Sequence, residues 1–265
     1  MPIFDGKVAL VTGGSSGIGK ATAMAFALSG ANVVIAARGE ERGEQTIEEI
    51  AAAGGDAIFV PTDVTKANDV ERLVLRTVET FGRLDYAFNN AANVDGSIGA
   101  LTDLTEEDFD QSIATNLKSV WLGMKYEIRQ MLKQEPKGGA IVNTSSGNGL
   151  GGCPGASIYA AAKAGVIALS KSAAWEYANE GIRVNALVAG AFRTPMLDGS
   201  MERASGGDPE ARKAVEAGWN SMIASGRIGD PAEAAAAVLW LCSGASSYVV
   251  GHSLIVDGGL TARWR

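Results

Sequence analysis

The sequence is poor in the residues that build metal sites and disulfide frameworks. It holds one histidine, His252, and two cysteines, Cys153 and Cys242, among 265 residues. A single histidine excludes a histidine-rich metal site and a catalytic triad that needs histidine as its base. Two cysteines do not make a disulfide framework. We therefore expect a chain that folds around an apolar core and uses no bound metal.

An excess of positive charge and long apolar runs are also missing. The formal net charge of −7 disfavours broad binding to nucleic acid. No apolar run reaches the roughly 20 residues that a helix needs to cross a bilayer. The start, Met-Pro-Ile-Phe-Asp-Gly-Lys, lacks the basic and apolar regions of a signal peptide. We therefore expect a cytoplasmic protein with neither a nucleic-acid nor a membrane partner.

What the chain does contain is an alternation of apolar runs and helical patterns. Such alternation is typical of a doubly wound α/β fold, in which a parallel sheet carries helices on both faces. The length fits one such domain over residues 1–265. The predicted strands are 7–12, 33–37, 57–61, 84–89, 140–144, 183–188 and 253–256, and the predicted helices are 20–29, 40–53, 66–81, 105–133, 157–178 and 231–243.

The first predicted strand leads into a candidate phosphate site. Residues 7–12 are followed at once by a glycine-rich turn and then by an alanine-rich helix. Strand, glycine turn and helix in this order form the opening of a Rossmann-type dinucleotide-binding unit. Glycines let the backbone approach a pyrophosphate, and a helix start offers free N–H groups. The residues expected to form this site are Gly13, Ser15, Ser16, Gly17, Ile18 and Gly19.

Tyr159 and Lys163 form a candidate pair for proton transfer. They lie four residues apart in a run that favours helix, so they share one face of it. A nearby cation favours the phenolate, and we therefore expect Lys163 to lower the pKa of Tyr159 from its usual value of about 10. A tyrosine tuned in this way can give or take a proton when a carbonyl and an alcohol interconvert.

Together these motifs resemble those of the short-chain dehydrogenase/reductase family. The shared pattern is Thr12-Gly13-x-x-x-Gly17-Ile18-Gly19, Asn89-Asn90-Ala91-Ala92, Ser146 and Tyr159-x-x-x-Lys163, in the order and at the distances found in the family. The resemblance runs from residue 7 to about residue 259. It implies a Rossmann-like sheet of about seven strands, a nicotinamide cofactor, and hydride transfer between that cofactor and a small ketone or secondary alcohol.

The resemblance also implies roles for single residues in catalysis. Tyr159 is expected to act as the general acid/base, and Ser146 to donate a hydrogen bond to the reacting oxygen. Lys163 is expected to contact the nicotinamide ribose as well as the tyrosine. Asn116 is expected to support a proton relay that reaches the lysine through water.

Further residues are expected, by resemblance, to contact the cofactor. Asp63 corresponds to the position beside the adenine ring, Asn90 and Ala91 to the segment against the ribose, and Thr194 to the carboxamide contact. Ala92 and Ala189 depart from the family, which usually has glycine and proline there. Val64, Ala92 and Phe192 are also expected to contact the cofactor. Tyr159 and Lys163, from the catalytic group, are expected to contact it as well.

The end of the second predicted strand bears on which nicotinamide is used. In dinucleotide folds an acidic residue at this position binds the ribose 2′-hydroxyl. Here Ala37 occupies it, and Arg38 follows. Because no carboxylate stands at position 37, the guanidinium of Arg38 is suited to bind a 2′-phosphate. We predict NADP(H), with NAD(H) as the alternative because Glu40 and Glu41 add negative charge nearby.

Residues 193–230 interrupt the alternation and are too long for an ordinary turn. They carry Met196, Leu197 and Trp219 among charged residues, and we interpret them as a helical lid over the substrate. The alternative is a surface excursion or an oligomer contact.

The sequence thus predicts an NADP(H)-dependent oxidoreductase acting on a ketone or secondary alcohol. The alternatives are an NAD-dependent alcohol, sugar or steroid dehydrogenase, a reductase of carrier-bound 3-oxoacyl groups, and a non-catalytic nucleotide-binding redox sensor. By resemblance we also expect a homo-oligomer, a tetramer or a dimer.

Overall fold

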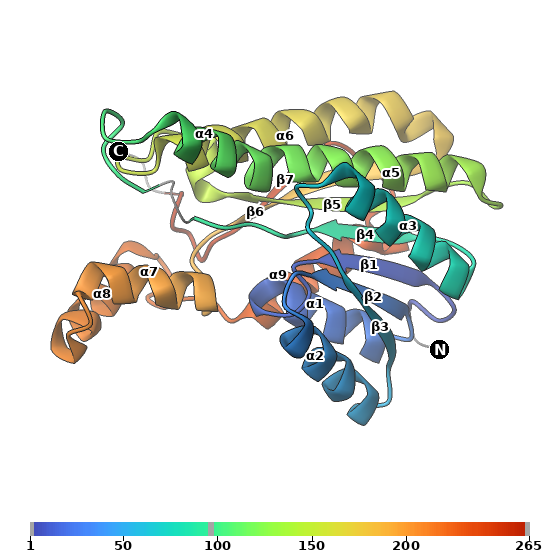
Figure 1. The fold of residues 1–265 in the computed structure, drawn as a ribbon, viewed down its shortest axis with the longest axis horizontal. Coiled ribbons are helices and arrows are strands. Elements are labelled where there is room, and N and C mark those ends of the chain that lie inside the picture. The colour runs from blue at the N-terminus through green and yellow to red at the C-terminus, as the bar shows by residue number, and fades with distance from the viewer. Residues whose placement is uncertain (1–2, 95–97, 263–265) are drawn as a thin grey trace.

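The computed structural model describes residues 3–94 and 98–262, which form a parallel sheet with helices on both faces (Figure 1). The seven strands in this part of the chain pair in the order β3-β2-β1-β4-β5-β6-β7, and every pair is parallel. The predicted doubly wound α/β fold is therefore confirmed. The strands are β1 Val8–Thr12, β2 Asn32–Ala37, β3 Asp56–Pro61, β4 Tyr86–Asn89, β5 Gly139–Ser146, β6 Ile182–Ala189 and β7 Ser253–Val256.

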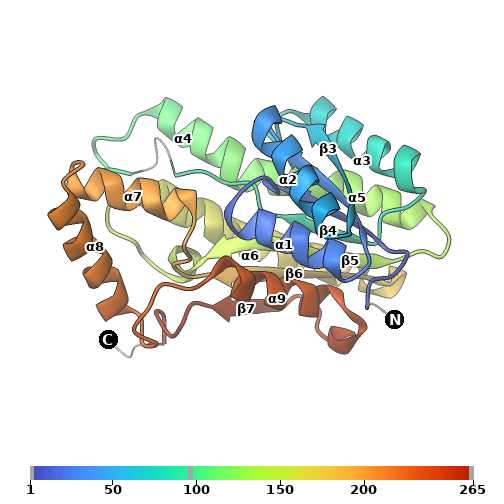
Figure 2. The ribbon, with the colours of Figure 1, turned by 90° about the horizontal axis from the view of Figure 1, so that it is seen from below.

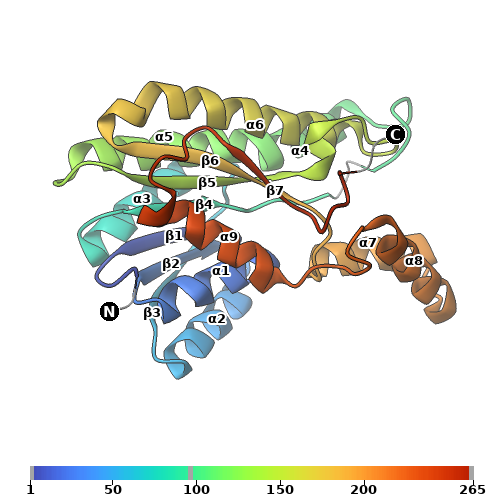
Figure 3. The same ribbon diagram turned by 180° about the vertical axis from the view of Figure 1, so that it is seen from behind.

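Helices cover both faces of the sheet (Figures 2 and 3). On one face lie α1 (Gly17–Leu28), α2 (Glu40–Ala52) and α9 (Pro231–Cys242). On the other lie α3 (Ala67–Phe81), α5 (Ser119–Lys133) and α6 (Ser157–Tyr177). Because helices shield both faces, all five residues of β1 are buried, as expected for a strand inside a parallel sheet.

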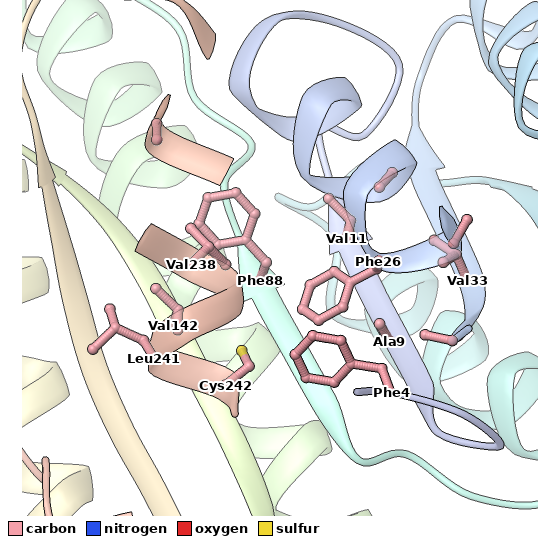
Figure 4. Close-up of a cluster of buried hydrophobic side chains, with 14 of the residues drawn as sticks. Phe4, Ala9, Val11, Phe26, Val33, Phe88, Val142, Val238, Leu241 and Cys242 are labelled. Carbon is pink, nitrogen blue, oxygen red and sulfur yellow. The ribbon is translucent and has the colours of Figure 1, made fainter. Parts of the chain in front are cut away.

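Each face has its own apolar core. Under α1 and α9, Phe4 meets Phe26 edge to face, with ring centroids 5.1 Å apart (Figure 4). Under α3, α5 and α6 the core includes Leu73, Met131 and Ile141. The sheet is thus held from both sides, which fixes the positions at which its strands end.

The helix predicted over residues 105–133 is interrupted. It consists of α4 (Glu106–Ile113), a π-helical segment at Ala114–Lys118, and α5. Thr105 caps α4 through a reciprocal pair of hydrogen bonds with Asp108. π-Helical segments are frequent at functional sites, and this one carries Asn116 in the protein interior.

The segment 193–230 forms two helices, α7 (Pro195–Ser205) and α8 (Pro209–Met222), which extend past the sheet (Figures 1 and 3). Arg212 of α8 reaches back to α7, with guanidinium nitrogens 3.0 Å from a carboxylate oxygen of Asp198 and 2.8 Å from one of Glu202. The predicted helical character is found, and movement as a lid stays a prediction.

Between residues 3 and 262, as far as they are described, no helix combines the length and apolar character needed to cross a bilayer. Several aromatic side chains lie on the surface, Trp175 and Tyr248 almost fully. That the protein forms a homo-oligomer stays a prediction, which a measurement of its molecular mass in solution would test.

A buried polar network crosses the core behind the carboxyl ends of β4 and β5. The carboxylate of Glu127 on α5, 1 % exposed, accepts a hydrogen bond from Asn89 Nδ2 at 2.9 Å. The same nitrogen lies 3.0 Å from Asn143 Oδ1, and Asn143 Nδ2 donates to Ser170 Oγ at 2.9 Å. Burial raises the pKa of Glu127 to about 7, against the lowering effect of the hydrogen bond from Asn89.

Glu127→Gln should change how the stability of the protein depends on pH. Because the folded-state pKa lies above the ordinary value of 4.5, the wild type is favoured while this group is protonated and loses stability as pH rises towards 7. Glutamine keeps an acceptor for Asn89 and does not titrate. We expect the variant to gain up to about 3 kcal/mol over the wild type between pH 5 and pH 8, measured by urea unfolding.

Glu44→Gln is the matched control, because Glu44 is exposed on α2. Identical pH dependence for Glu127→Gln and wild type would show that this carboxyl group does not titrate in that range.

Candidate active site

A cleft of about 640 Å³ lies along the carboxyl ends of the strands. This is the edge at which ligands bind in open α/β sheets. Of the residues predicted for the cofactor, all but Gly19 line it, and Ser146, Tyr159 and Lys163 of the catalytic group line it as well. The lining residues from the predicted sets are Gly13, Ser15, Ser16, Gly17, Ile18, Arg38, Asp63, Val64, Asn90, Ala91, Ala92, Ser146, Tyr159, Lys163, Phe192 and Thr194.

The glycine turn after β1 leaves the start of α1 open to a ligand. Its N-cap residue, Ser16, makes no side-chain capping hydrogen bond, so N–H groups of the first turn remain for an anion. Gly13 and Gly17 have φ values of 66° and 51°, a region that favours glycine. A Cβ atom on Gly17 would also lie 2.9 Å from Thr194 Cγ2.

Gly19 serves the packing of this turn. A Cβ atom there would lie 2.2 Å from the carbonyl oxygen of Gly13 and 2.7 Å from Asn90 Nδ2. Only glycine therefore lets α1 begin against the turn. The glycine cradle and the uncapped helix start together fit the pyrophosphate of a dinucleotide.

Hydrogen bonds tie the ends of β1, β4 and β5 together. The backbone N–H of Asn90 donates to Thr12 Oγ1 at 3.0 Å, and Asn90 Nδ2 donates to the Thr12 carbonyl at 3.3 Å. Thr144 Oγ1 donates to Asn90 Oδ1 at 3.3 Å. Both polar atoms of the Asn90 side-chain amide are thus hydrogen-bonded to protein groups, and they align the three strand ends beneath the cleft.

The end of β2 presents two guanidinium groups. Arg38 and Arg42 both line the cleft and are exposed, beside Ala37. Within the described residues neither has an ion-pair partner. Arg42 was not predicted from the sequence. It lies in the first turn of α2 while Arg38 precedes that helix, so no shared helix face links the two residues in the sequence pattern.

Asp63 lies at the end of β3 with its carboxylate held locally. Its Oδ1 accepts hydrogen bonds from the Thr65 hydroxyl at 2.7 Å and the Thr65 N–H at 3.1 Å. Burial raises the pKa of Asp63, but these hydrogen bonds and the charge of Lys66 outweigh burial and hold the pKa below its usual value. The group is an anion in the cleft wall.

The structure brings Ser146, Tyr159 and Lys163 together. Tyr159 and Lys163 lie on α6 and are 9 % and 1 % exposed, with Lys163 Nζ 5.7 Å from the centroid of the tyrosine ring. Lys163 Nζ donates to the carbonyl of Thr144 at 2.9 Å, and Ser146 at the end of β5 is hydrogen-bonded to Tyr159. Two hydroxyl groups therefore meet at one point of the cleft.

The predicted lowering of the tyrosine pKa is wrong for this structure. Burial raises the pKa of Tyr159 to about 12, and the hydrogen bond with Ser146 opposes it only in part. Burial also lowers the pKa of Lys163 to about 8. The sequence spacing places the ammonium near the phenol, but both groups lie away from water, and desolvation is the largest cause of both pKa shifts.

Asn116 lies behind the cleft wall. Its Oδ1 accepts a hydrogen bond from the backbone N–H of Asn93 at 3.2 Å, and its Nδ2 donates to Ser112 Oγ at 3.3 Å. In this structure it holds the backbone that follows Ala92, while Lys163 donates to Thr144. Its place in a proton relay stays a prediction.

The β6–α7 connection closes the far side of the cleft. Phe192 is buried there, and Thr194 Oγ1 caps α7 by accepting a hydrogen bond from the Leu197 N–H at 3.3 Å. Leu197, Met196 and Trp219 of the predicted lid line the cleft. The lining residues that sequence reasoning missed include Arg42, Ile98, Asn148, Ser200 and Leu260.

Among the described residues, no three or more histidine, cysteine, aspartate or glutamate side chains gather in a way that could hold a metal ion.

Comparison with known proteins places the chain in a family. The family model described as "Enoyl-(Acyl carrier protein) reductase" matches residues 13–261. A 2,5-dichloro-2,5-cyclohexadiene-1,4-diol dehydrogenase from Sphingobium indicum is 43 % identical over 262 residues, covering 99 % of this chain and 100 % of the relative. A cyclohexanol dehydrogenase from Acinetobacter sp. is 38 % identical over 260 residues, covering 98 % and 97 %.

Among solved structures, the crystal structure of levodione reductase superposes with a TM-score of 0.93 at 36 % identity, covering 98 % of this chain and 100 % of that one. The chain belongs to the short-chain dehydrogenase/reductase family, as its motifs predicted. It is an oxidoreductase of that family.

Gly19→Ala should disrupt the phosphate cradle. The added methyl group would displace the carbonyl of Gly13 or the start of α1, because 2.2 Å is far below a van der Waals contact. We expect a lower Tm and a Kd for the reduced dinucleotide that rises at least about tenfold, a loss of about 1.4 kcal/mol. Fluorescence titration and thermal melting measure the two effects.

Gly218→Ala is the matched control, since a Cβ atom at Gly218 in α8 meets nothing within 4 Å. It should bind the dinucleotide as the wild type does, with an equal or higher Tm because alanine favours helix. Wild-type affinity in Gly19→Ala would contradict the assignment of this turn.

Proposed function

We propose that this protein transfers a hydride between NADP(H) and a ketone or secondary alcohol, with Tyr159 as the general acid/base. The observation that carries the proposal is the meeting of Tyr159 and Ser146 over buried Lys163, in the same cleft as the glycine cradle. The nicotinamide, when bound, supplies or accepts the hydride.

Ser146 and Tyr159 are arranged to hold one substrate oxygen. The N–H of Asn148 donates to Ser146 Oγ at 3.2 Å and so fixes that oxygen beside the phenol. Negative charge grows on a carbonyl oxygen as it is reduced, and hydrogen bonds from both hydroxyl groups strengthen with it. Tyr159 then gives its proton to that oxygen.

The two shifted pKa values suit this step. A phenol with a pKa of about 12 is protonated at neutral pH and ready to donate. A lysine with a pKa of about 8 still carries its charge there, and a buried cation stabilises the phenolate that proton transfer leaves behind. In alcohol oxidation the same groups act in reverse.

We propose NADP(H) as the preferred cofactor because of the charge at the end of β2. Arg38 and Arg42 line the cleft there, Ala37 brings no carboxylate, and two guanidinium groups can bind one phosphate through several charge-assisted hydrogen bonds. Residues Glu40 and Glu41 begin α2 beside them, which leaves NAD(H) as the alternative.

We propose that the substrate is a ring of about cyclohexane size. The substrate end of the cleft has an apolar wall, and two relatives are named for a cyclohexadiene diol and for cyclohexanol. The residues of that wall are Val94, Ile98, Met196, Leu197, Trp219 and Leu260. A helical lid formed by α7 and α8 would close over such a ring.

Tyr159→Phe should lower kcat by about 10²- to 10⁴-fold, the usual contribution of general acid–base catalysis. Cofactor affinity should stay within about twofold, because the ring and its packing are kept. Following the absorbance of the reduced nicotinamide against cyclic ketones and alcohols measures both. Tyr177→Phe, at the far end of the same helix, should behave as the wild type. A Tyr159→Phe enzyme with most of its activity would rule out this residue as the acid.

Arg38→Ala and Arg42→Ala should each raise KM for NADPH about tenfold or more and leave KM for NADH nearly unchanged, since a charge-assisted hydrogen bond contributes about 1.5–3 kcal/mol. Ala37→Asp should shift preference towards NADH. Steady-state kinetics with both cofactors measures this, with Arg76→Ala on the exposed face of α3 as control. A wild type that strongly prefers NADH would refute the cofactor assignment.

A further inference from the structure

The side chain of Asn148 lies beside the reaction centre but has no part in the chemistry described so far. It belongs to the short 3-10 turn Gly147–Leu150, which follows β5, and its side chain is half-buried. Its backbone N–H donates to Ser146 Oγ, and the residue lines the cleft. A substrate whose reacting oxygen is held by Ser146 would therefore have Asn148 as a close neighbour.

This turn is held in place on both sides of Asn148. A Cβ atom on Gly149 would lie 2.8 Å from the carbonyl carbon of Lys163 and 2.9 Å from Ser145 Oγ. A Cβ atom on Gly147 would lie 3.2 Å from Thr261 Cγ2. The turn thus packs directly on the catalytic helix and on the segment after β7, so Asn148 has a fixed position relative to Lys163.

The side-chain amide of Asn148 has no hydrogen-bond partner among the described residues. Other polar groups that line this part of the cleft are already engaged. Ser145 Oγ donates to the carbonyl of Lys163 at 2.8 Å, and Ser200 Oγ donates to the carbonyl of Met196 at 3.0 Å. The amide offers a donor and an acceptor that the protein itself does not use.

A second oxygen on the substrate would need such a partner. The substrate end of the cleft is otherwise walled largely by apolar side chains, and an oxygen buried there without a hydrogen bond is unfavourable. An amide can accept from a hydroxyl group or donate to a carbonyl group, so it can serve either oxidation state of that second position.

We propose that Asn148 is a specificity-determining residue that binds a second hydroxyl or carbonyl oxygen of the substrate. The preferred substrate class is then a ring with two oxygen functions, one reacting at Ser146 and Tyr159 and the other held by Asn148. This inference rests on the proposed function. The names of the relatives do not decide it, since one names a cyclic diol and another a cyclic alcohol with a single oxygen.

The test compares kcat/KM for cyclohexanol with kcat/KM for the 1,2-, 1,3- and 1,4-cyclohexanediols. The wild type should prefer at least one diol by about tenfold. In Asn148→Leu, which keeps the shape of the side chain and removes its hydrogen bonds, that ratio should fall to about one, because the loss falls on kcat/KM for the diol. The backbone N–H that fixes Ser146 is unchanged by this substitution.

Two further variants sharpen the result. Asn148→Asp keeps an acceptor and loses the donor. It should therefore retain the preference for the diol over cyclohexanol and lose the wild-type preference for 1,4-cyclohexanedione over cyclohexanone. Asn179→Leu makes the same change as Asn148→Leu at an exposed residue far from the cleft and should keep every wild-type ratio.

The outcomes separate the two proposals. The role of Asn148 is overturned by a wild type that oxidises cyclohexanol without preferring any diol, by an Asn148→Leu enzyme that keeps the diol preference, or by an Asn148→Asp enzyme that keeps a preference for 1,4-cyclohexanedione over cyclohexanone. Each of these results leaves the proposed reaction standing. A wild type that turns over no ring alcohol and no ring ketone overturns the proposed function, and the role of Asn148 with it.

Discussion

The constraint on which this structure depends is that its parallel strands all end at one edge. Segments far apart in the sequence, after β1, β4 and β5, are brought side by side there, and the hydrogen bonds among Thr12, Asn90 and Thr144 hold their ends in register. Apolar cores on both faces keep the strands from shifting. The proposed phosphate cradle and the proposed proton-transfer group therefore share one cleft.

Burial sets the chemistry of the catalytic group. Tyr159 and Lys163 are both removed from water, and each is pushed towards its neutral form, the phenol with a pKa of about 12 and the lysine with a pKa of about 8. In the proposed reduction of a carbonyl group the two shifts have complementary effects. The phenol would keep its proton until an oxygen that gains negative charge is present, and the cation of Lys163 would stabilise the phenolate that results.

The sequence predicted the fold and the motif residues because both follow from local pattern. Apolar strands alternate with helices, and the glycines and the Tyr159–Lys163 pair are short-range spacings. The direction of the tyrosine pKa was mispredicted because spacing shows which groups are neighbours but not how far water is excluded. The π-helical segment at Asn116 was not predicted because no local residue pattern in Ala114–Lys118 distinguishes a π-helical turn from an α-helical one. That Arg42 and Asn148 line the cleft could be seen only in the tertiary structure.

The two ends of the cleft are formed by different parts of the chain. The proposed cofactor end relies on backbone N–H groups and on glycines whose Cβ atoms would collide with the turn or with Thr194, so few substitutions are expected to be tolerated there. The proposed substrate end is formed by side chains of the Gly147–Leu150 turn, of α7 and α8, and of the segments that hold Val94, Ile98 and Leu260, all of which lie outside the sheet. Side chains there can change without disturbing the cradle. Relatives that are about 40 % identical over nearly the whole chain can therefore share the fold and carry different substrate names.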